Sequence, residues 1–256
     1  YELLDEIGEG GFSKVYQATD TRNQVVIALK VLKDQRLLRS SAVRQQLIER
    51  EKLTASLEHP HILPVYEVAE YENTICIAMR LVASGSLADF MSYSYWRPST
   101  RQILDLARQV ADGLAYIHGK QLTHRDLKPS NILLTYDGKA FLSDIGMVEV
   151  LGNAFRDKII GTPEYMAPEA ILYLDRVDQR SDIYSLGVIL FQLFKGKPPF
   201  TSETASEVLF DQVNQDVPEL TDIPQEIAGV IYRCLAKDPR ERIQTASEVR
   251  EIISEL

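Results

Sequence analysis

The stretch His124-Arg125-Asp126-Leu127-Lys128-Pro129-Ser130-Asn131 carries more information about this chain than any other. It gathers a carboxylate (Asp126), an ammonium (Lys128) and a carboxamide (Asn131) in one short loop. Pro129 fixes its own φ angle and favours an extended backbone at the preceding residue. Each short fragment of the run is compatible with an ordinary polar turn. The whole run is much harder to explain in that way.

The run resembles the catalytic loop of protein kinases. The resemblance implies phosphoryl transfer: Asp126 would accept the proton of a substrate hydroxyl, and Lys128 would face the transferred phosphate. Asn131 would give an oxygen to Mg²⁺. The other motifs of the chain follow in the order of this family, which favours the kinase interpretation over a polar turn.

Length and composition set limits on the possible functions. A chain of 256 residues with 45% hydrophobic and 25% charged residues is typical of a globular domain, or of two small lobes. The net charge of -9 argues against a nucleic-acid partner, which would need a basic face. It does not argue against ATP, because a few well-placed cations neutralise phosphates locally.

Cysteines and apolar segments indicate the cellular setting. Cys76 and Cys234 lie in apolar surroundings, so we expect two buried thiols and no disulfide. The four histidines show no metal-ligand pattern. The longest apolar stretch, 183–194, is too short to span a bilayer and predicts a buried helix. We expect a cytoplasmic domain that makes no membrane contact and belongs to a longer protein, as in relatives anchored by segments outside their catalytic domain.

The hydrophobic pattern divides the chain into two parts. Strands are predicted at 25–32, 65–68 and 74–81, with one long helix at 35–57. Beyond the small residues Ala83-Ser84-Gly85-Ser86, the pattern predicts mostly helices: one from Thr100 to Gly119, followed by 181–195, 224–236 and 245–256. A hairpin is predicted for 132–135 and 139–142, around Asp137-Gly138. We therefore predict an α+β, two-lobed kinase-like fold with a small lobe at 1–82, a hinge at about 82–86 and a helical lobe at 87–256.

A glycine-containing loop, Gly8-Glu9-Gly10-Gly11-Phe12-Ser13-Lys14-Val15, lies between two strand-like segments. It resembles the loop that covers the phosphates in kinases, although Ser13 replaces the usual third glycine. Alone, it is equally compatible with a simple hairpin turn. The absence of a following Gly-Lys-Ser/Thr argues against a P-loop NTPase. The resemblance implies nucleotide contacts from Ile7, Gly8, Glu9, Gly10, Gly11, Val15, Ala28, Lys30, Met79, Val82 and Leu133.

Ile27-Ala28-Leu29-Lys30 resembles the Val-Ala-Ile-Lys strand of kinases. The resemblance implies that Lys30 contacts the α- and β-phosphates and pairs with a helix glutamate. Taken alone, a lysine at the end of an apolar strand commonly reaches solvent. Met79 would limit the depth of the nucleotide pocket, or would simply belong to the core. Val82 would present its backbone N–H to adenine.

The glutamate partner of Lys30 has two candidates, Glu49 and Glu51. Counting back from His59-Pro60 with the spacing usual in the family leads to Arg50. A one-residue deletion would restore Glu51, which we choose, with Glu49 as the alternative. Either glutamate could also belong to a solvated helix face.

Two further motifs surround the activation segment. Ser143-Asp144-Ile145-Gly146 resembles Asp-Phe-Gly, and the resemblance implies that Asp144 holds Mg²⁺. The run 161–169 resembles the end of the segment, where Lys128 and Thr162 together are typical of serine/threonine kinases. Two residues would serve structural roles by the same resemblance: Asp182 would hold the catalytic-loop backbone, and Arg242 would pair with Glu169.

The residues between Gly146 and Gly161 include no serine, threonine or tyrosine. In kinases with an arginine at the position of Arg125, a loop phosphate often pairs with that arginine. We therefore hypothesise that loop phosphorylation is not the switch here. Glu149 or Asp157 would supply a permanent charge, or a homodimer or other partner would order the segment. Alternatively, the segment is disordered until substrate binds.

The motifs together predict a serine/threonine protein kinase domain that uses ATP with Mg²⁺ or Mn²⁺ and acts on protein substrates, itself included. The stretch 59–66 resembles bacterial kinases of the eukaryotic type. One alternative is a pseudokinase scaffold that binds nucleotide, although Lys30, Asp126, Asn131 and Asp144 are all present. Another is a small-molecule kinase, against which the peptide-docking motif at 162–169 argues.

Overall fold

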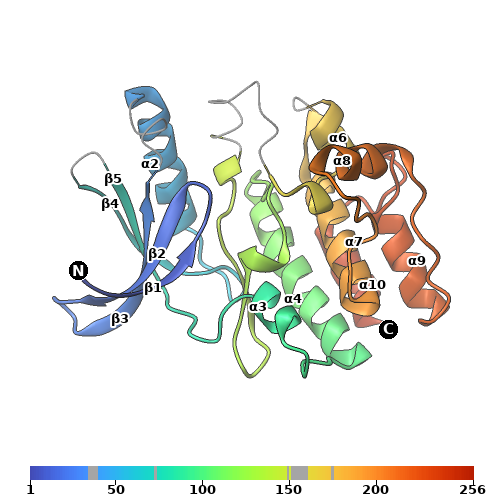
Figure 1. Cartoon of the computed structure of the whole chain (residues 1–256), viewed down its shortest axis with the longest axis horizontal. Coiled ribbons are helices and arrows are strands. Elements are labelled where there is room, and N and C mark those ends of the chain that lie inside the picture. Colours follow the sequence, from blue (N-terminus) through green and yellow to red (C-terminus); the bar gives the residue numbers. More distant parts are fainter. Residues whose placement is uncertain (34–39, 72–73, 149, 151–160, 174–175) are drawn as a thin grey trace.

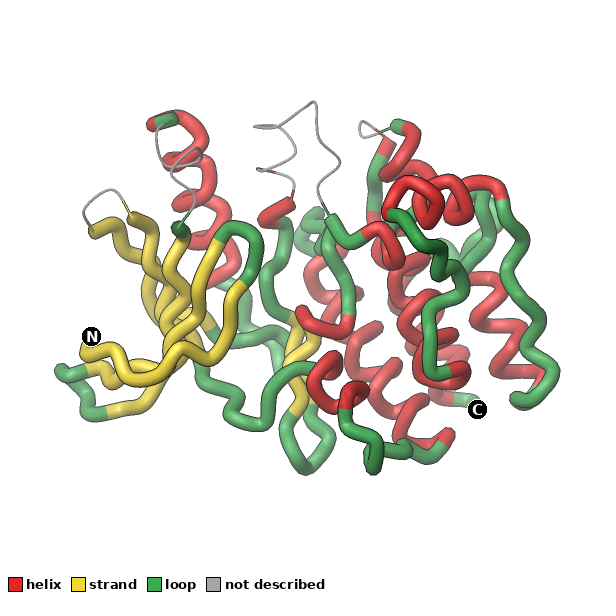
Figure 2. Tube along the Cα trace, in the orientation of Figure 1, coloured by secondary structure: helices red, strands yellow, loops and turns green. Residues whose placement is uncertain are grey.

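The computed structural model describes residues 1–33, 40–71, 74–148, 150, 161–173 and 176–256. Figure 1 shows a strand-rich lobe that contains the N-terminus and a larger helical lobe that contains the C-terminus. Figure 2, which is coloured by secondary structure, shows loops that run between the two lobes. The arrangement is the two-lobed kinase fold predicted above.

The small lobe is built on an antiparallel sheet. Among the described residues this sheet has five strands in the order β1-β2-β3-β5-β4. The consecutive apolar residues of β3 explain its central place, because Ile27 to Lys30 are all buried. Helix α2 packs on β4 and β5 (Figure 1). The bounds are β1 Glu2–Glu9, β2 Ser13–Asp20, β3 Val25–Leu32, α2 Ser41–Ala55, β4 Val65–Tyr71 and β5 Thr74–Met79.

The helical lobe surrounds α7, whose residues Ser181 to Phe191 are all buried. Helices α4, α9 and α10 contribute to the same hydrophobic core. Gly196, with φ at +78°, ends α7 in the left-handed conformation that glycine adopts at low cost. The bounds are α3 Leu87–Ser92, α4 Thr100–Gly119, β6 Ile132–Leu134, β7 Ala140–Leu142, α6 Pro168–Leu172, α7 Gln179–Lys195, α8 Ala205–Asn214, α9 Gln225–Cys234 and α10 Ala246–Ser254, with 3₁₀ turns at Pro129–Asn131 and Pro163–Tyr165.

Several sequence predictions are confirmed in detail. Strand β3 and helix α4 have the predicted bounds, and β6 pairs with β7 as the predicted hairpin. Helix α4 begins where predicted because Ser99 and Gln102 form a reciprocal capping box at its N-terminus. Both cysteines are free. Among the described residues, no helix has the length and apolar character needed to cross a membrane.

Other predictions need correction. Helices α3, α6 and α8 were not predicted, because each is short and its apolar pattern is brief. Strand β5 ends at Met79, two residues early, where the Arg80 N–H donates to the carbonyl of Pro64. Cys76 is only half-buried. Residues 35–39 of the predicted long helix lie outside the described residues, and α2 begins at Ser41.

Candidate active site

The backbone of the catalytic loop is held by a buried carboxylate. Asp182 of α7 accepts hydrogen bonds from the N–H groups of His124 (2.8 Å) and Arg125 (2.9 Å). Nε2 of His118 lies 2.8 Å from the same carboxylate. These bonds fix Arg125 at φ +65°, a costly conformation for a non-glycine residue. Burial by itself would raise the pKa of Asp182, but the bonds from His118 and the backbone keep that pKa below its ordinary value.

The loop brings together the side chains that the sequence singled out. Nζ of Lys128 lies 2.8 Å from Oδ2 of Asp126 and donates to Oγ1 of Thr162 at 2.9 Å. Nδ2 of Asn131 donates to the backbone carbonyl of Asp126 at 2.8 Å and to its carboxylate at 3.0 Å. The carboxylate of Asp126 is therefore oriented from two sides, beside a hydroxyl of the segment that follows the activation loop.

Lys30 and Asp144 connect the two lobes. Nζ of Lys30 donates to Oδ1 of Asp144 at 2.6 Å and to Sδ of Met147 at 3.7 Å. The turn after Asp144 is tied to the catalytic loop, because the Gly146 N–H donates to the carbonyl of His124 at 3.0 Å. Burial is the largest single effect and would raise the pKa of Asp144. The charge and hydrogen bond of Lys30, with the charges of His124 and Lys128, together lower that pKa below its ordinary value, so the carboxylate stays ionised at neutral pH.

Helix α2 presents Glu51, not Glu49, to the interior. Glu51 is buried, whereas Glu49 is exposed and accepts a hydrogen bond from Gln45. Within the described part of the chain, no ion pair joins Glu51 to Lys30, so their pairing stays a prediction. Burial raises the pKa of Glu51 to about 7, against the opposing effect of the Lys30 charge. The guanidinium of Arg50 lies against Gly146, where an added Cβ would be 1.8 Å from Nη2.

An apolar cluster lies between the lobes at the predicted place of the adenine. It contains five of the residues predicted to contact the nucleotide, whereas Ile7 of β1 is exposed and lies outside the cluster. The glycine loop is closed by a hydrogen bond from the Gly10 N–H to the carbonyl of Ser13 (2.8 Å), and Glu9 pairs with Lys33. The five clustered residues are Val15, Ala28, Met79, Val82 and Leu133.

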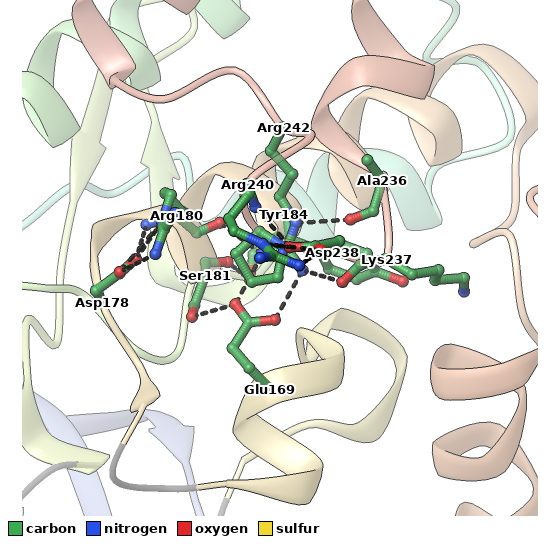
Figure 3. A network of polar contacts seen from close by, with 12 residues as sticks. Glu169, Asp178, Arg180, Ser181, Tyr184, Ala236, Lys237, Asp238, Arg240 and Arg242 are labelled. Atoms are coloured by element: carbon green, nitrogen blue, oxygen red, sulfur yellow. Dashed lines mark hydrogen bonds and ion pairs between the residues drawn. The ribbon is translucent and has the colours of Figure 1, made fainter.

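The predicted ion pair between Glu169 and Arg242 lies in the helical lobe (Figure 3). Two hydrogen bonds of 2.7 Å join the guanidinium to the carboxylate, and Ser181 donates a third to Glu169. The side chain of Arg242 is 0% exposed. This pair anchors the end of the segment 162–169 to the core.

Several contacts at the site were not predicted. Met147 was missed because a methionine after Asp-x-Gly carries no sequence signal for contact with a lysine. His118 was missed because it lies on the last turn of α4, where a histidine commonly interacts with the helix end alone. The two acids proposed to neutralise Arg125, Glu149 and Asp157, lie outside the described residues. Arg125 itself donates from Nε to Oγ1 of Thr123 at 3.0 Å.

The fold and this set of side chains define a protein kinase domain. The model of the protein kinase domain family matches residues 1–252, and the chain belongs to this family. The match covers both lobes, including every motif described above.

The curated relatives extend the comparison. The chain is 32% identical to serine/threonine-protein kinase PknD of Mycobacterium tuberculosis, over 97% of this chain and 38% of that protein. It is 30% identical to serine/threonine-protein kinase PLK4 of Drosophila grimshawi, over 98% of this chain and 33% of that protein. It is 29% identical to serine/threonine-protein kinase PrkC of Bacillus subtilis, over 97% of this chain and 39% of that protein. The chain thus spans less than half the length of these relatives.

Proposed function

We propose that this chain transfers the γ-phosphoryl group of ATP to serine or threonine hydroxyls of protein substrates, and that it can phosphorylate itself. The observation that carries the proposal is the contact of Lys128 with both Asp126 and Thr162. This contact supports the proposal, because a carboxylate suited to accept a proton, a cation suited to face the phosphate and the first residue of the segment 162–169 meet at one point.

Each residue has a role in this proposal. Asp126 orients the substrate hydroxyl and accepts its proton, while Lys128 balances the charge of the transferred phosphoryl group. Lys30 positions the nucleotide phosphates, and Glu51 holds Lys30 in place. The cluster around Ala28 and Met79 encloses the adenine, and the glycine loop, residues 8–11, covers the phosphates.

The site also fits a divalent cation. Because Nδ2 of Asn131 is bonded to Asp126, its Oδ1 is the atom left to bind a cation. Asp144 engages Lys30 through Oδ1, which leaves Oδ2 as a second hard oxygen ligand. Asn131 and Asp144 would therefore hold Mg²⁺ or Mn²⁺, and the metal would supply charge neutralisation for the phosphates.

Two observations favour the alternative, a nucleotide-binding scaffold without transfer activity. In the described residues Lys30 pairs with Asp144, and no ion pair joins it to Glu51. Arg50 also occupies the position at which the usual spacing expects the glutamate. A scaffold would bind ATP but would transfer no phosphate.

Incubation of the purified domain with labelled ATP and Mg²⁺, with myelin basic protein as a generic substrate, separates the two. We expect label on serine or threonine residues of the substrate and of the domain, located by mass spectrometry. Repeating the assay at several protein concentrations shows whether association of two copies raises the rate. ATP binding without any transfer would favour the scaffold.

A further inference from the structure

We propose that Gln212 of α8 is a positioning residue for protein substrates, because it fixes the backbone of the docking segment, residues 162–169. The inference rests on the kinase function proposed above. It assigns a role in substrate binding to a residue that carries no sequence signal.

Gln212 uses its whole amide group in contacts with other elements. Its residue is 0% exposed. Nε2 donates to the carbonyls of Pro163 (3.1 Å) and Glu164 (2.6 Å), and Oε1 accepts from the hydroxyl of Tyr184 in α7 at 2.5 Å. Because the donors and the acceptor of this buried amide all form hydrogen bonds, the amide is held in one orientation. The hydroxyl of Tyr184 sets that orientation, since it donates to Oε1.

The next residue of the docking segment is held in the same way. The carbonyl of Tyr165 accepts from Oγ of Ser185 at 2.8 Å, and its phenol donates to Gln192 at 2.7 Å. Three consecutive carbonyls, from Pro163 to Tyr165, therefore bond to side chains of α7 and α8. With these carbonyls engaged, the path of the backbone through this turn is defined by the two helices.

Gln212 is also joined to the ion pair at the end of the segment. Nζ of Lys237 donates to the carbonyl of Gln212 at 2.7 Å, and Nη2 of Arg242 donates to the carbonyl of Lys237 at 3.1 Å. The Arg242 guanidinium lies 4.8 Å from the ring centroid of Tyr184 (Figure 3). Both the start of the segment, through Gln212, and its end, through Glu169, are thus attached to one polar network.

This attachment has a direct consequence for the reaction. Thr162, the residue before Pro163, contacts Lys128, which contacts Asp126. If Gln212 no longer held Pro163 and Glu164, the docking surface would move relative to the proton acceptor. The nucleotide site lies on other elements and would keep its geometry. The loss should therefore appear in the binding of protein substrate and not in the binding of ATP.

Gln212→Met tests this proposal, because methionine keeps the length of the side chain but offers no N–H donor. Gln215→Met is the matched control, since Gln215 is the exposed C-cap of the same helix. We expect the KM for myelin basic protein to rise about tenfold in Gln212→Met. The KM for ATP should stay within about twofold, because the nucleotide site lies on other elements, and Gln215→Met should match wild type.

Tyr184→Phe provides a second variant in case Gln212→Met fails to fold. It removes the hydroxyl that orients the amide but leaves both donors, so the KM for the protein substrate should rise by a smaller factor, about threefold. An unchanged KM for the protein substrate in Gln212→Met, or in Tyr184→Phe if only that variant folds, would overturn the inference. So would a parallel rise in the KM for ATP. A wild-type protein that binds ATP but phosphorylates nothing would instead overturn the proposed function.

Discussion

Glu51 is a buried carboxyl group of α2, and the ammonium of Lys30 is the charge that most strongly opposes the effect of burial on its pKa. Since the two side chains form no ion pair in the described residues, burial prevails and raises the pKa of Glu51 to about 7. The proposed function requires this carboxylate to be ionised and to hold Lys30. Burial in the folded protein therefore favours the protonated form of Glu51, whereas the proposed activity requires the ionised form.

The first prediction compares the two glutamates of α2. Glu51→Gln should lower the rate of phosphate transfer by about 10²-fold, because Lys30 loses the group that positions it. Glu49→Gln, the same change on the exposed face, should leave the rate within twofold. Steady-state kinetics at saturating ATP measure both. The reverse result would show that Glu49 is the partner of Lys30.

A second prediction concerns pH. Because the folded-state pKa of Glu51 lies above the unfolded value of 4.5, the native state binds more protons between pH 4.5 and about 7. Glu51 should therefore reduce the free energy of unfolding as pH rises through this window, by about 3 kcal/mol in total at 1.36 kcal/mol per pKa unit.

Urea denaturation of wild type and Glu51→Gln across this range checks the prediction. The variant should be the more stable protein at pH 8, and the two should converge near pH 4.5. Parallel curves with a constant offset would show that the carboxyl of Glu51 does not titrate in this window.

At the scale of elements, two helical glycines have opposite surroundings. A Cβ added to Gly187 of α7 would lie 2.7 Å from Cβ of Cys234, so this glycine permits α9 to pack closely on α7. A Cβ added to Gly229 of α9 would have no heavy atom within 4 Å among the described residues, its chain neighbours and the nearby backbone of its own helix aside. The same substitution should therefore have opposite effects at the two positions.

Gly187→Ala should reduce the free energy of unfolding by about 1–3 kcal/mol, because the added methyl group overpacks the contact between α7 and α9. Gly229→Ala should raise it by up to about 1 kcal/mol, because alanine is the better helix former. Thermal and urea unfolding measure both changes. Equal effects of the two substitutions would show that close packing at Gly187 is unimportant.

The elements differ in how well the sequence predicted them. Strand β3 has consecutive apolar residues, and helix α4 has a long apolar face. Each pattern fits one kind of element, and both elements were predicted with the right bounds. Helix α8 was missed, although Thr204 and Glu207 form a capping box that signals its start. Its apolar face is too short to identify a helix by periodicity alone.

The sequence predicted some residues of the candidate site and missed others, for a physical reason. The groups around Asp126 lie within one loop, so their spacing in the sequence brings them together. Gln212 is buried only because α7, α8 and the docking segment meet around it, and nothing near it in the sequence indicates this. The pairing of Lys30 depends on how α2 sits against the sheet, which spacing from His59 does not determine.

At the scale of the whole molecule, the ion pair of Arg242 and Glu169 holds the docking segment against the helical core. Both residues are buried, so removing one partner leaves an uncompensated charge. Arg242→Met should therefore reduce the free energy of unfolding by about 3–5 kcal/mol. Arg240→Met is the control, because Arg240 forms a surface pair with Asp238 and its side chain is 83% exposed.

The control should change the free energy of unfolding by less than about 1 kcal/mol. Denaturant unfolding of the two variants side by side gives the comparison. If Arg242→Met were no more destabilising than Arg240→Met, the buried pair would contribute nothing to holding the segment.

The central claim, that the loop around Asp126 transfers phosphate, is tested most directly by Asp126→Asn. Asp137→Asn in the exposed hairpin turn is the same chemical change away from the site. With labelled ATP, Mg²⁺ and myelin basic protein, Asp126→Asn should transfer phosphate about 10²–10⁴-fold more slowly than wild type, since it lacks the proton acceptor. Its affinity for ATP should stay within twofold, and Asp137→Asn should match wild type. Equal transfer by wild type and Asp126→Asn would contradict the account.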